Sequence, residues 1–220
     1  LVRETSLSPA DFMFPMFIME GENTKVEIPS MPGIFRRTLD LTVEEVKELY
    51  ALGIRAVNIY VKVSDDLKDN TGKEAWNDNG LMQRAIRAIK AACPEMIVMP
   101  DVALDPYSIY GHDGIIEKGD VTNDATNDAL VKMAVSHAKA GADFVAPSDM
   151  MDGRVLRLRQ GLDAAGFHNV GIMSYSAKYA SAFYGPFRDA LDSAPKDADV
   201  EVPKDKKTYQ MDYANRIEAV

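Results

Sequence analysis

Cysteine is almost absent from this sequence, since Cys93 is the single cysteine among 220 residues. One thiol excludes an internal disulfide and any zinc site built on several cysteines. A lone cysteine also fits a reducing compartment, and we therefore expect a cytoplasmic protein.

An excess of positive charge is missing as well. The formal net charge is −9, with no basic stripe to offset it, so we expect no nucleic-acid partner. Long apolar runs are also missing. The most apolar stretch, residues 11–19, is too short to cross a bilayer and contains Pro15, so we interpret it as a buried strand and expect no membrane partner.

A repeated local pattern is present instead, in which a helical segment is followed by an apolar strand. Thr42 and Glu45 have the spacing of a capping box at the start of the first helix. The strands are near-continuous apolar runs, which is typical of parallel strands covered on both faces. The predicted helix and strand pairs are 42–53 with 56–63, 81–93 with 96–104, 127–141 with 143–149, and 154–166 with 170–176.

This alternation predicts a single α/β domain over residues 1–220, either a barrel or a doubly wound sheet. No G-x-G-x-x-G or Walker motif follows a strand, which disfavours a nucleotide-binding sheet. Polar residues cluster directly after the strands, where barrel enzymes carry their active sites, so the barrel is favoured. Residues 191–207 are rich in Asp and Lys and are either a mobile lid or a solvated insertion.

Lys178 is the first candidate for chemistry. It follows Ser174, Tyr175 and Ser176, and its nearest acidic neighbour in the sequence is Asp189. Most lysines are solvated, and the local features alone slightly favour that reading. The alternative is a Schiff-base nucleophile, whose amine needs a pKa lowered by burial or by a second cation.

The segment 101–114 concentrates carboxylates, with Asp101, Asp105 and Asp113 beside His112. It lacks the thiolates or several histidines that zinc requires. Clustered carboxylates suit magnesium or a proton-transfer role, and an ordinary solvated loop is an equal alternative. Arg188 and Lys207 flank 191–207 and could hold a substrate carboxylate, although exposed cations are the commoner case.

Several stretches together resemble the porphobilinogen synthase (5-aminolevulinate dehydratase) family. They occur in order across nearly the whole chain: "FPMFIMEG", "SMPGIFRRTLD", "LGIRAVNIYV", "IVMPDVALDPYSIYGHDGI", "DFVAPSDMMDGRV", "IMSYSAKYASAFYGPFRDA" and "YQMDYAN". The resemblance implies a (β/α)8 TIM barrel, of which this chain would cover about the first six strands. It also implies the condensation of two 5-aminolevulinate molecules to porphobilinogen, with loss of two waters, in tetrapyrrole synthesis.

The resemblance implies roles for individual residues. Lys178 in "SYSAK" matches the first of two Schiff-base lysines, and Arg188 and Lys207 match the residues that hold one substrate carboxylate. The other residues on or near implied active-site positions are Asp101, Ser148, Tyr175, Tyr184 and Gln210. With a second lysine nearby, we expect the pKa of Lys178 to be lowered.

The resemblance also bears on metals and assembly. Zinc-dependent members carry three cysteines where this loop has Ala103, Asp105 and Asp113, so no active-site zinc is expected. The aspartate-bearing branch is commonly stimulated by magnesium, which we expect to act allosterically through a glutamate beyond Val220, with Asp105 and Asp113 as weak candidate ligands within this chain. The resemblance implies a homo-octamer or a smaller form that interconverts with it.

Two expectations concern the ends of the chain. The extended N-terminal arm of the family does not precede "LVRET", and the second Schiff-base lysine would lie beyond "RIEAV". We therefore expect the functional protein to continue past Val220, the alternative being a shortened paralogue that binds ligand or subunits without turnover. Another lysine-dependent barrel, such as a class I aldolase, is the alternative enzyme.

Overall fold

A computed structural model describes residues 2–196 and 201–220. Its main feature is a seven-stranded sheet in the order β2-β3-β1-β4-β5-β8-β9, in which only β2 runs antiparallel. The strands are β1 (Met13–Met19), β2 (Lys25–Glu27), β3 (Phe35–Thr38), β4 (Ala56–Lys62), β5 (Ile97–Val102), β8 (Phe144–Pro147) and β9 (Gly171–Ile172). A separate hairpin pairs β6 (Ile116–Glu117) with β7 (Asp120–Val121).

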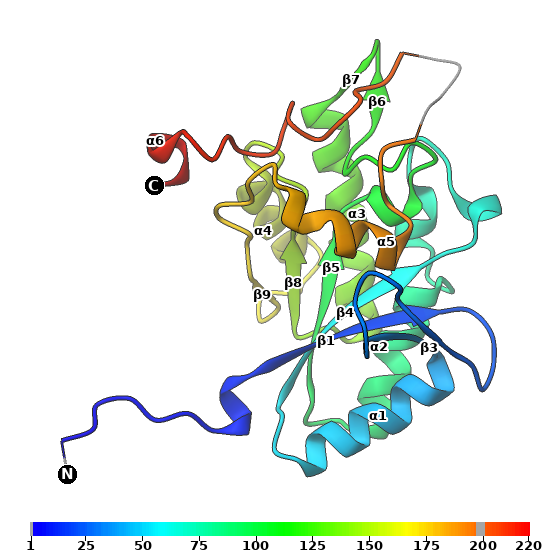
Figure 1. Ribbon diagram of the computed structural model, residues 1–220, viewed down its shortest axis with the longest axis vertical. Coiled ribbons are helices and arrows are strands. Elements are labelled where there is room, and N and C mark those ends of the chain that lie inside the picture. Colours follow the sequence, from blue (N-terminus) through cyan, green and yellow to red (C-terminus); the bar gives the residue numbers. More distant parts are fainter. Residues whose placement is uncertain (1, 197–200) are drawn as a thin grey trace.

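Helices connect the strands and cover one face of the sheet (Figure 1). The longer ones are α1 (Leu39–Ala51), α2 (Leu81–Ala92), α3 (Asn123–Ala140) and α4 (Arg154–Ala164), followed by the short α5 (Gly185–Leu191) and α6 (Arg216–Ala219). Single 3₁₀ turns are formed by Pro9–Asp11, Asp65–Leu67, Lys73–Trp76, Asp105–Tyr107 and Ala182–Tyr184. Within the described ranges no helix is long and apolar enough to cross a membrane.

The strand order decides between the two predicted architectures. Strands β1, β4, β5, β8 and β9 lie side by side in chain order, and a helix precedes each of β4, β5, β8 and β9. A doubly wound sheet reverses its order at a switch point, whereas a barrel adds strands in one direction. The (β/α) barrel class predicted from the sequence is therefore confirmed by the series from β1 to β9. Strand β3, which pairs with the other side of β1, lies outside this series.

The start of α1 differs from the prediction. The helix begins at Leu39, so Thr38 occupies the N-cap position and Thr42 lies inside the first turns. The Thr42 hydroxyl donates to the carbonyl of Thr38 at 3.0 Å, and Glu45 pairs with Arg37 at 2.9 Å. The predicted capping box of Thr42 and Glu45 is wrong, because a hydroxyl inside a helix can satisfy itself on the preceding turn.

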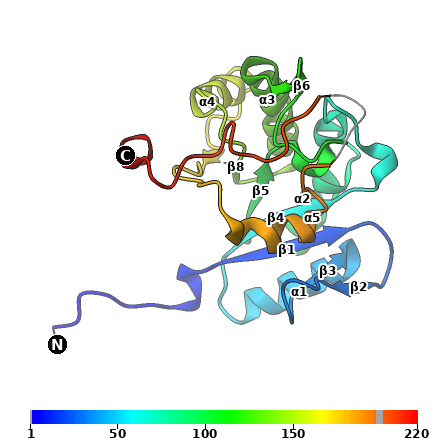
Figure 2. The same cartoon turned by 45° about the horizontal axis from the view of Figure 1, so that its top comes forward.

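The two faces of the sheet bury different residues. Val57, Ile59 and Val61 of β4 join the large core beneath helices α1 to α4. Tyr60 points to the other face, where it packs with Phe187 of α5 at 4.7 Å between ring centroids. Figure 2 shows α5 lying across β4 and β1 on this second face. This alternation follows from the two-residue period of a strand and directs polar side chains toward the space under α5.

Candidate active site

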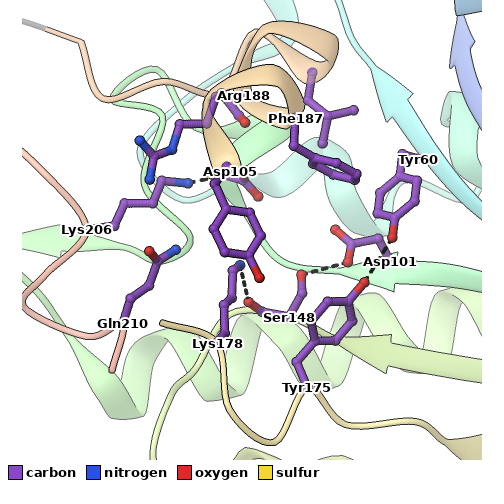
Figure 3. Close-up of a pocket in the computed structure, with 13 residues that line it drawn as sticks. Tyr60, Asp101, Asp105, Ser148, Tyr175, Lys178, Phe187, Arg188, Lys206 and Gln210 are labelled. Carbon is purple, nitrogen blue, oxygen red and sulfur yellow. Dashed lines mark hydrogen bonds and ion pairs between the residues drawn. The ribbon is translucent and has the colours of Figure 1, made fainter. Parts of the chain in front are cut away.

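A cavity of about 70 Å³ lies under α5, at the carboxyl ends of the parallel strands (Figure 3). Since one water needs about 10–15 Å³ of space open to its centre, this volume holds only a few waters. The cavity as it stands is therefore small. Its lining residues are Tyr60, Asp101, Asp105, Ser148, Tyr175, Lys178, Tyr184, Phe187, Arg188, Leu191, Ser193, Lys206 and Gln210.

Strand register explains why residues far apart in the sequence meet here. Asp101 pairs with Ala146 and Val102 with Pro147 across β5 and β8, so Asp101 and Ser148 emerge at the same edge. The Ser148 hydroxyl donates to the Asp101 carboxylate at 2.6 Å. Burial, reinforced by the charge of Asp105, raises the pKa of Asp101 to about 7 despite that hydrogen bond. Asp101 can therefore both accept and release a proton near neutral pH.

Lys178 is buried at the cavity wall, and its ammonium group is not in apolar surroundings. Nζ donates to the Ser148 carbonyl at 2.5 Å and lies 3.4 Å from the Asp113 carboxylate. Burial lowers the pKa of Lys178, but the charges of Asp113, Asp105 and Asp101 together raise it above its ordinary value. The predicted lowering of this pKa is wrong, because Asp113 is 65 residues away in the sequence but adjacent in the fold.

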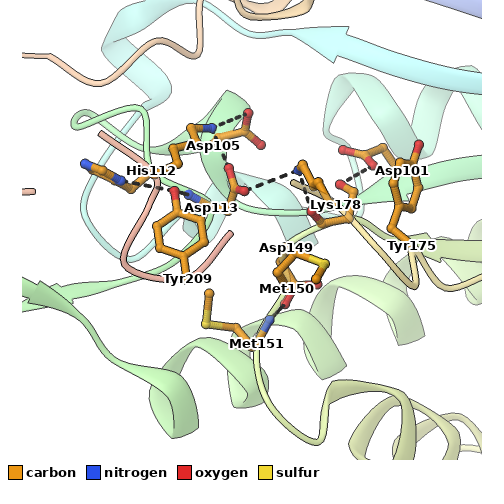
Figure 4. Close-up of polar contacts among 12 residues, drawn as sticks. Asp101, Asp105, His112, Asp113, Asp149, Met150, Met151, Tyr175, Lys178 and Tyr209 are labelled. Atoms are coloured by element: carbon orange, nitrogen blue, oxygen red, sulfur yellow. Dashed lines mark hydrogen bonds and ion pairs between the residues drawn. The ribbon is translucent and has the colours of Figure 1, made fainter. Parts of the chain in front are cut away.

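Lys206 shares Asp113 with Lys178, whose own contact with Asp113 is drawn in Figure 4. Lys206 Nζ lies 2.6 Å from one oxygen of Asp113, while Lys178 approaches the other, and it also lies 3.4 Å from Asp105. Both lysines lower the pKa of Asp113 against the opposing effect of its burial. The result is a buried chain of alternating charges in which every carboxylate faces at least one ammonium group.

The structure does not bring Lys207 to this cavity. Its side chain is 76% exposed and pairs with Asp205 at 3.7 Å, whereas the side chain of Lys206 is 3% exposed. Lys206 and Lys207 are neighbours in this turn, but the side chain of Lys206 faces the cavity and that of Lys207 faces the surface. Lys206 therefore has the position predicted for Lys207.

Arg188 and Gln210 line the cavity as predicted. Within the described part of the chain, Arg188 Nε and Gln210 Oε1 are buried and lack a hydrogen-bond partner. An unpartnered buried polar atom is costly unless a ligand or water satisfies it. These two groups, with Lys206, are thus available to bind a polar ligand.

Three tyrosines complete the wall. Tyr184 lies with its ring centroid 5.5 Å from Lys178 Nζ. The Tyr175 hydroxyl is 2.9 Å from the hydroxyl of Tyr60, which accepts a hydrogen bond from Asn58 at 2.7 Å. Tyr175 and Tyr184 were predicted from the sequence. Tyr60 and Phe187 were not predicted. For Tyr60 a signal was available, because polar Asn58 and Tyr60 alternate with apolar residues along β4.

Asp105 and Asp113 do not fit a metal ion in this arrangement, because the Lys206 ammonium group lies between them. No group of three or more His, Cys, Asp or Glu residues suited to a metal occurs in residues 2–196 and 201–220.

Comparisons with known proteins agree with this geometry. A sequence model of the delta-aminolevulinic acid dehydratase family matches residues 1–220. The chain belongs to the delta-aminolevulinic acid dehydratase family. It is 54% identical to the chloroplastic enzyme of Chlamydomonas reinhardtii, with all of this chain and 57% of that protein aligned. Identity to the enzyme of Halalkalibacterium halodurans is 48%, covering 65% of that protein.

A solved structure of a family member has the same fold. The delta-aminolevulinic acid dehydratase of Toxoplasma gondii, in complex with the reaction product porphobilinogen, superimposes with a TM-score of 0.93 at 47% identity. The alignment covers 99% of this chain and 61% of the other. The chain thus spans between half and two thirds of the length of such relatives.

Proposed function

We propose that the full protein condenses two molecules of 5-aminolevulinate to porphobilinogen and releases two waters. The observation that carries the proposal is Lys178, a buried amine at the wall of a small polar cavity, beside Asp101, Ser148 and Asp113. The names of the family members and the bound product in the Toxoplasma gondii relative support the same reaction.

Lys178 acts as the nucleophile in this proposal. Its neutral amine attacks the ketone carbon of 5-aminolevulinate, a C–N bond forms, and the former ketone oxygen leaves as water to give a Schiff base. Lys178 must first lose a proton, which its neighbouring carboxylates oppose. Asp101, with a pKa of about 7, is the group suited to accept that proton and return one to the departing oxygen.

The substrate carboxylate binds to Arg188 and Lys206, with Gln210 beside them. Arg188 offers the planar fork that suits a carboxylate, and its Nε has no partner within the described residues. Lys206 exchanges part of its pairing with Asp113 and Asp105 for the incoming carboxylate. The incoming carboxylate adds one negative charge to the site, and the guanidinium group of Arg188 offsets it.

Borohydride trapping tests the proposal. Reduction in the presence of 5-aminolevulinate should leave a mass adduct on the peptide that contains Lys178. The matched variants are Lys178→Ala, which should lose both this adduct and turnover, and Lys207→Ala, which should keep both. An adduct elsewhere within residues 1–220, with Lys178 unmodified, contradicts the assignment.

We propose that residues 191–207 form the lid of the cavity. Leu191, Ser193 and Lys206 line it, and the Lys196 amide donates to the Tyr110 carbonyl at 3.1 Å. Residues 197–200 lie outside the described residues. Because the cavity holds only a few waters, it must widen to admit 5-aminolevulinate, and in this proposal the segment moves to make that room.

We also propose that activity is independent of zinc and stimulated by magnesium. Ala103, Asp105 and Asp113 offer no thiolate where zinc-dependent members have cysteines. The resemblance to the aspartate-bearing branch supports stimulation by magnesium, at a site other than Asp105 and Asp113. The homo-octamer and the cytoplasmic location stay predictions from the resemblance and from the lone buried Cys93. Several plant relatives are named as chloroplastic, so a plastid is the competing compartment.

A further inference from the structure

His112 is a buried imidazole that the proposed reaction does not use. It lies in the loop that also carries Asp105 and Asp113, and it is fully covered. Its Nε2 lies 2.8 Å from the Pro203 carbonyl and its Nδ1 lies 3.1 Å from the Tyr209 hydroxyl. One ring therefore contacts both ends of the segment 203–209, as Figure 4 shows for the Tyr209 end.

The partners determine which ring nitrogen carries the proton. A proline carbonyl can only accept, so Nε2 must donate to Pro203. The Tyr209 hydroxyl already accepts from the Asp113 amide at 3.2 Å, which leaves its own proton for Nδ1. Burial lowers the pKa of His112, in keeping with a neutral ring. A series of hydrogen bonds thus runs from the Asp113 amide through the Tyr209 hydroxyl and His112 to the Pro203 carbonyl. The tautomer with its proton on Nε2 satisfies every donor and acceptor in this series.

This chain holds the segment that carries Lys206. The amide of Gln210 donates to the Lys206 carbonyl at 2.9 Å, so Lys206, Tyr209 and Gln210 belong to one compact turn. His112 holds Tyr209 on one side of this turn and Pro203 on the other. Lys206 is thereby directed at Asp113, with its Nζ 2.6 Å from a carboxylate oxygen. Without His112, no other described side chain hydrogen-bonds to the Pro203 carbonyl.

We propose that His112 is a positioning residue that fastens residues 203–210 over the cavity and thereby sets the carboxylate-binding position of Lys206. The inference rests on the proposed function for the identity of the ligand. It assigns His112 no contact with the reacting atoms, so its removal should weaken substrate binding more than it slows the covalent step.

Two variants separate the two halves of the imidazole. His112→Asn places an acceptor near Nδ1 and keeps the Tyr209 contact, whereas His112→Gln places a donor near Nε2 and keeps the Pro203 contact. Each should raise KM for 5-aminolevulinate about 3- to 10-fold, as expected for one lost neutral hydrogen bond. His112→Ala should raise KM about 10- to 100-fold, with a smaller change in kcat. His168→Asn, at an exposed histidine, is the matched control.

Amide hydrogen exchange on the full protein without ligand gives a readout that does not depend on turnover. His112→Ala should speed exchange at Asp113 and at residues 206–210, with exchange in α2 and α3 unchanged. If it does so but the wild-type protein makes no porphobilinogen, the proposed reaction fails and the fastening role stands. Unchanged exchange in 206–210, or an unchanged KM with only a lower Tm, overturns the positioning role.

Discussion

Replacing Lys206 with methionine removes a buried charge and keeps the length of the side chain. Lys206 Nζ lies 2.6 Å from Asp113 and 3.4 Å from Asp105, and the side chain is 3% exposed. Removing one partner of a buried ion pair typically costs about 3–5 kcal/mol of unfolding free energy, because a charge is left uncompensated. Lys207→Met is the adjacent control, and an exposed pair is worth only about 0–1 kcal/mol.

Urea denaturation followed by circular dichroism measures the difference. With a slope of about 2–3 kcal/mol/M, Lys206→Met should lower the midpoint by about 1–2 M, while Lys207→Met should shift it by less than about 0.5 M. The variant should also raise KM for 5-aminolevulinate, because one of the proposed carboxylate ligands is gone. Equal effects of the two substitutions would refute the assignment of Lys206 to the site.

The pH dependence gives a second check on Lys206. Its charge helps to lower the folded-state pKa of Asp113, so the associated stability is present above the unfolded pKa of about 3.8–3.9. This stability is lost as the pH falls through the lower folded-state pKa. The difference between wild type and Lys206→Met should therefore be largest near neutral pH and shrink below about pH 4. A difference that grows in acid would contradict the pairing.

Three further outcomes are expected. Ser148→Ala removes the hydrogen bond that lowers the pKa of Asp101, so a carboxyl titration by NMR should move upward from about 7; a downward move would contradict the assignment. A metal-stripped protein should be stimulated by magnesium and not by zinc, and a stoichiometric zinc requirement would refute the zinc-independent proposal. Porphobilinogen should slow hydrogen exchange in 191–196 and 201–207, and unchanged exchange would count against the lid.

Local patterns in the sequence predicted the fold well, because strand and helix periods are local properties. The strands at 56–63 and 96–104 were placed within two residues of β4 and β5. The beginning of α1 was missed because Thr38 and Thr42 are both competent N-cap residues, and the choice depends on the preceding β3. Strand β9 is shorter than predicted, since only Gly171–Ile172 pair with β8.

The site was predicted in its residue types but not in its electrostatics. Asp101 lies near the end of β5, and Ser148, Tyr175 and Lys178 follow β8 and β9, so these residues could be grouped from that pattern. The environment of Lys178 depends on Asp113, a contact that no local pattern reveals. To choose between Lys206 and Lys207, one must know where each side chain points. Both lie in an irregular turn, where the sequence has no helix or strand periodicity that would predict this direction.

The alternation of side chains along β4 has a consequence for mutational tolerance. Ile59 and Val61 belong to the core beneath the helices, while Asn58 and Tyr60 belong to the hydrogen-bonded wall of the cavity. Deleting a single residue within this strand would exchange the two faces, since the side-chain period is two. Aliphatic groups would then replace the phenol at the cavity, and polar groups would enter the core. Insertions or deletions in the exposed turn at 64–66 do not exchange the two faces of β4. They should therefore be tolerated in this turn, whereas selection should remove them from β4 itself.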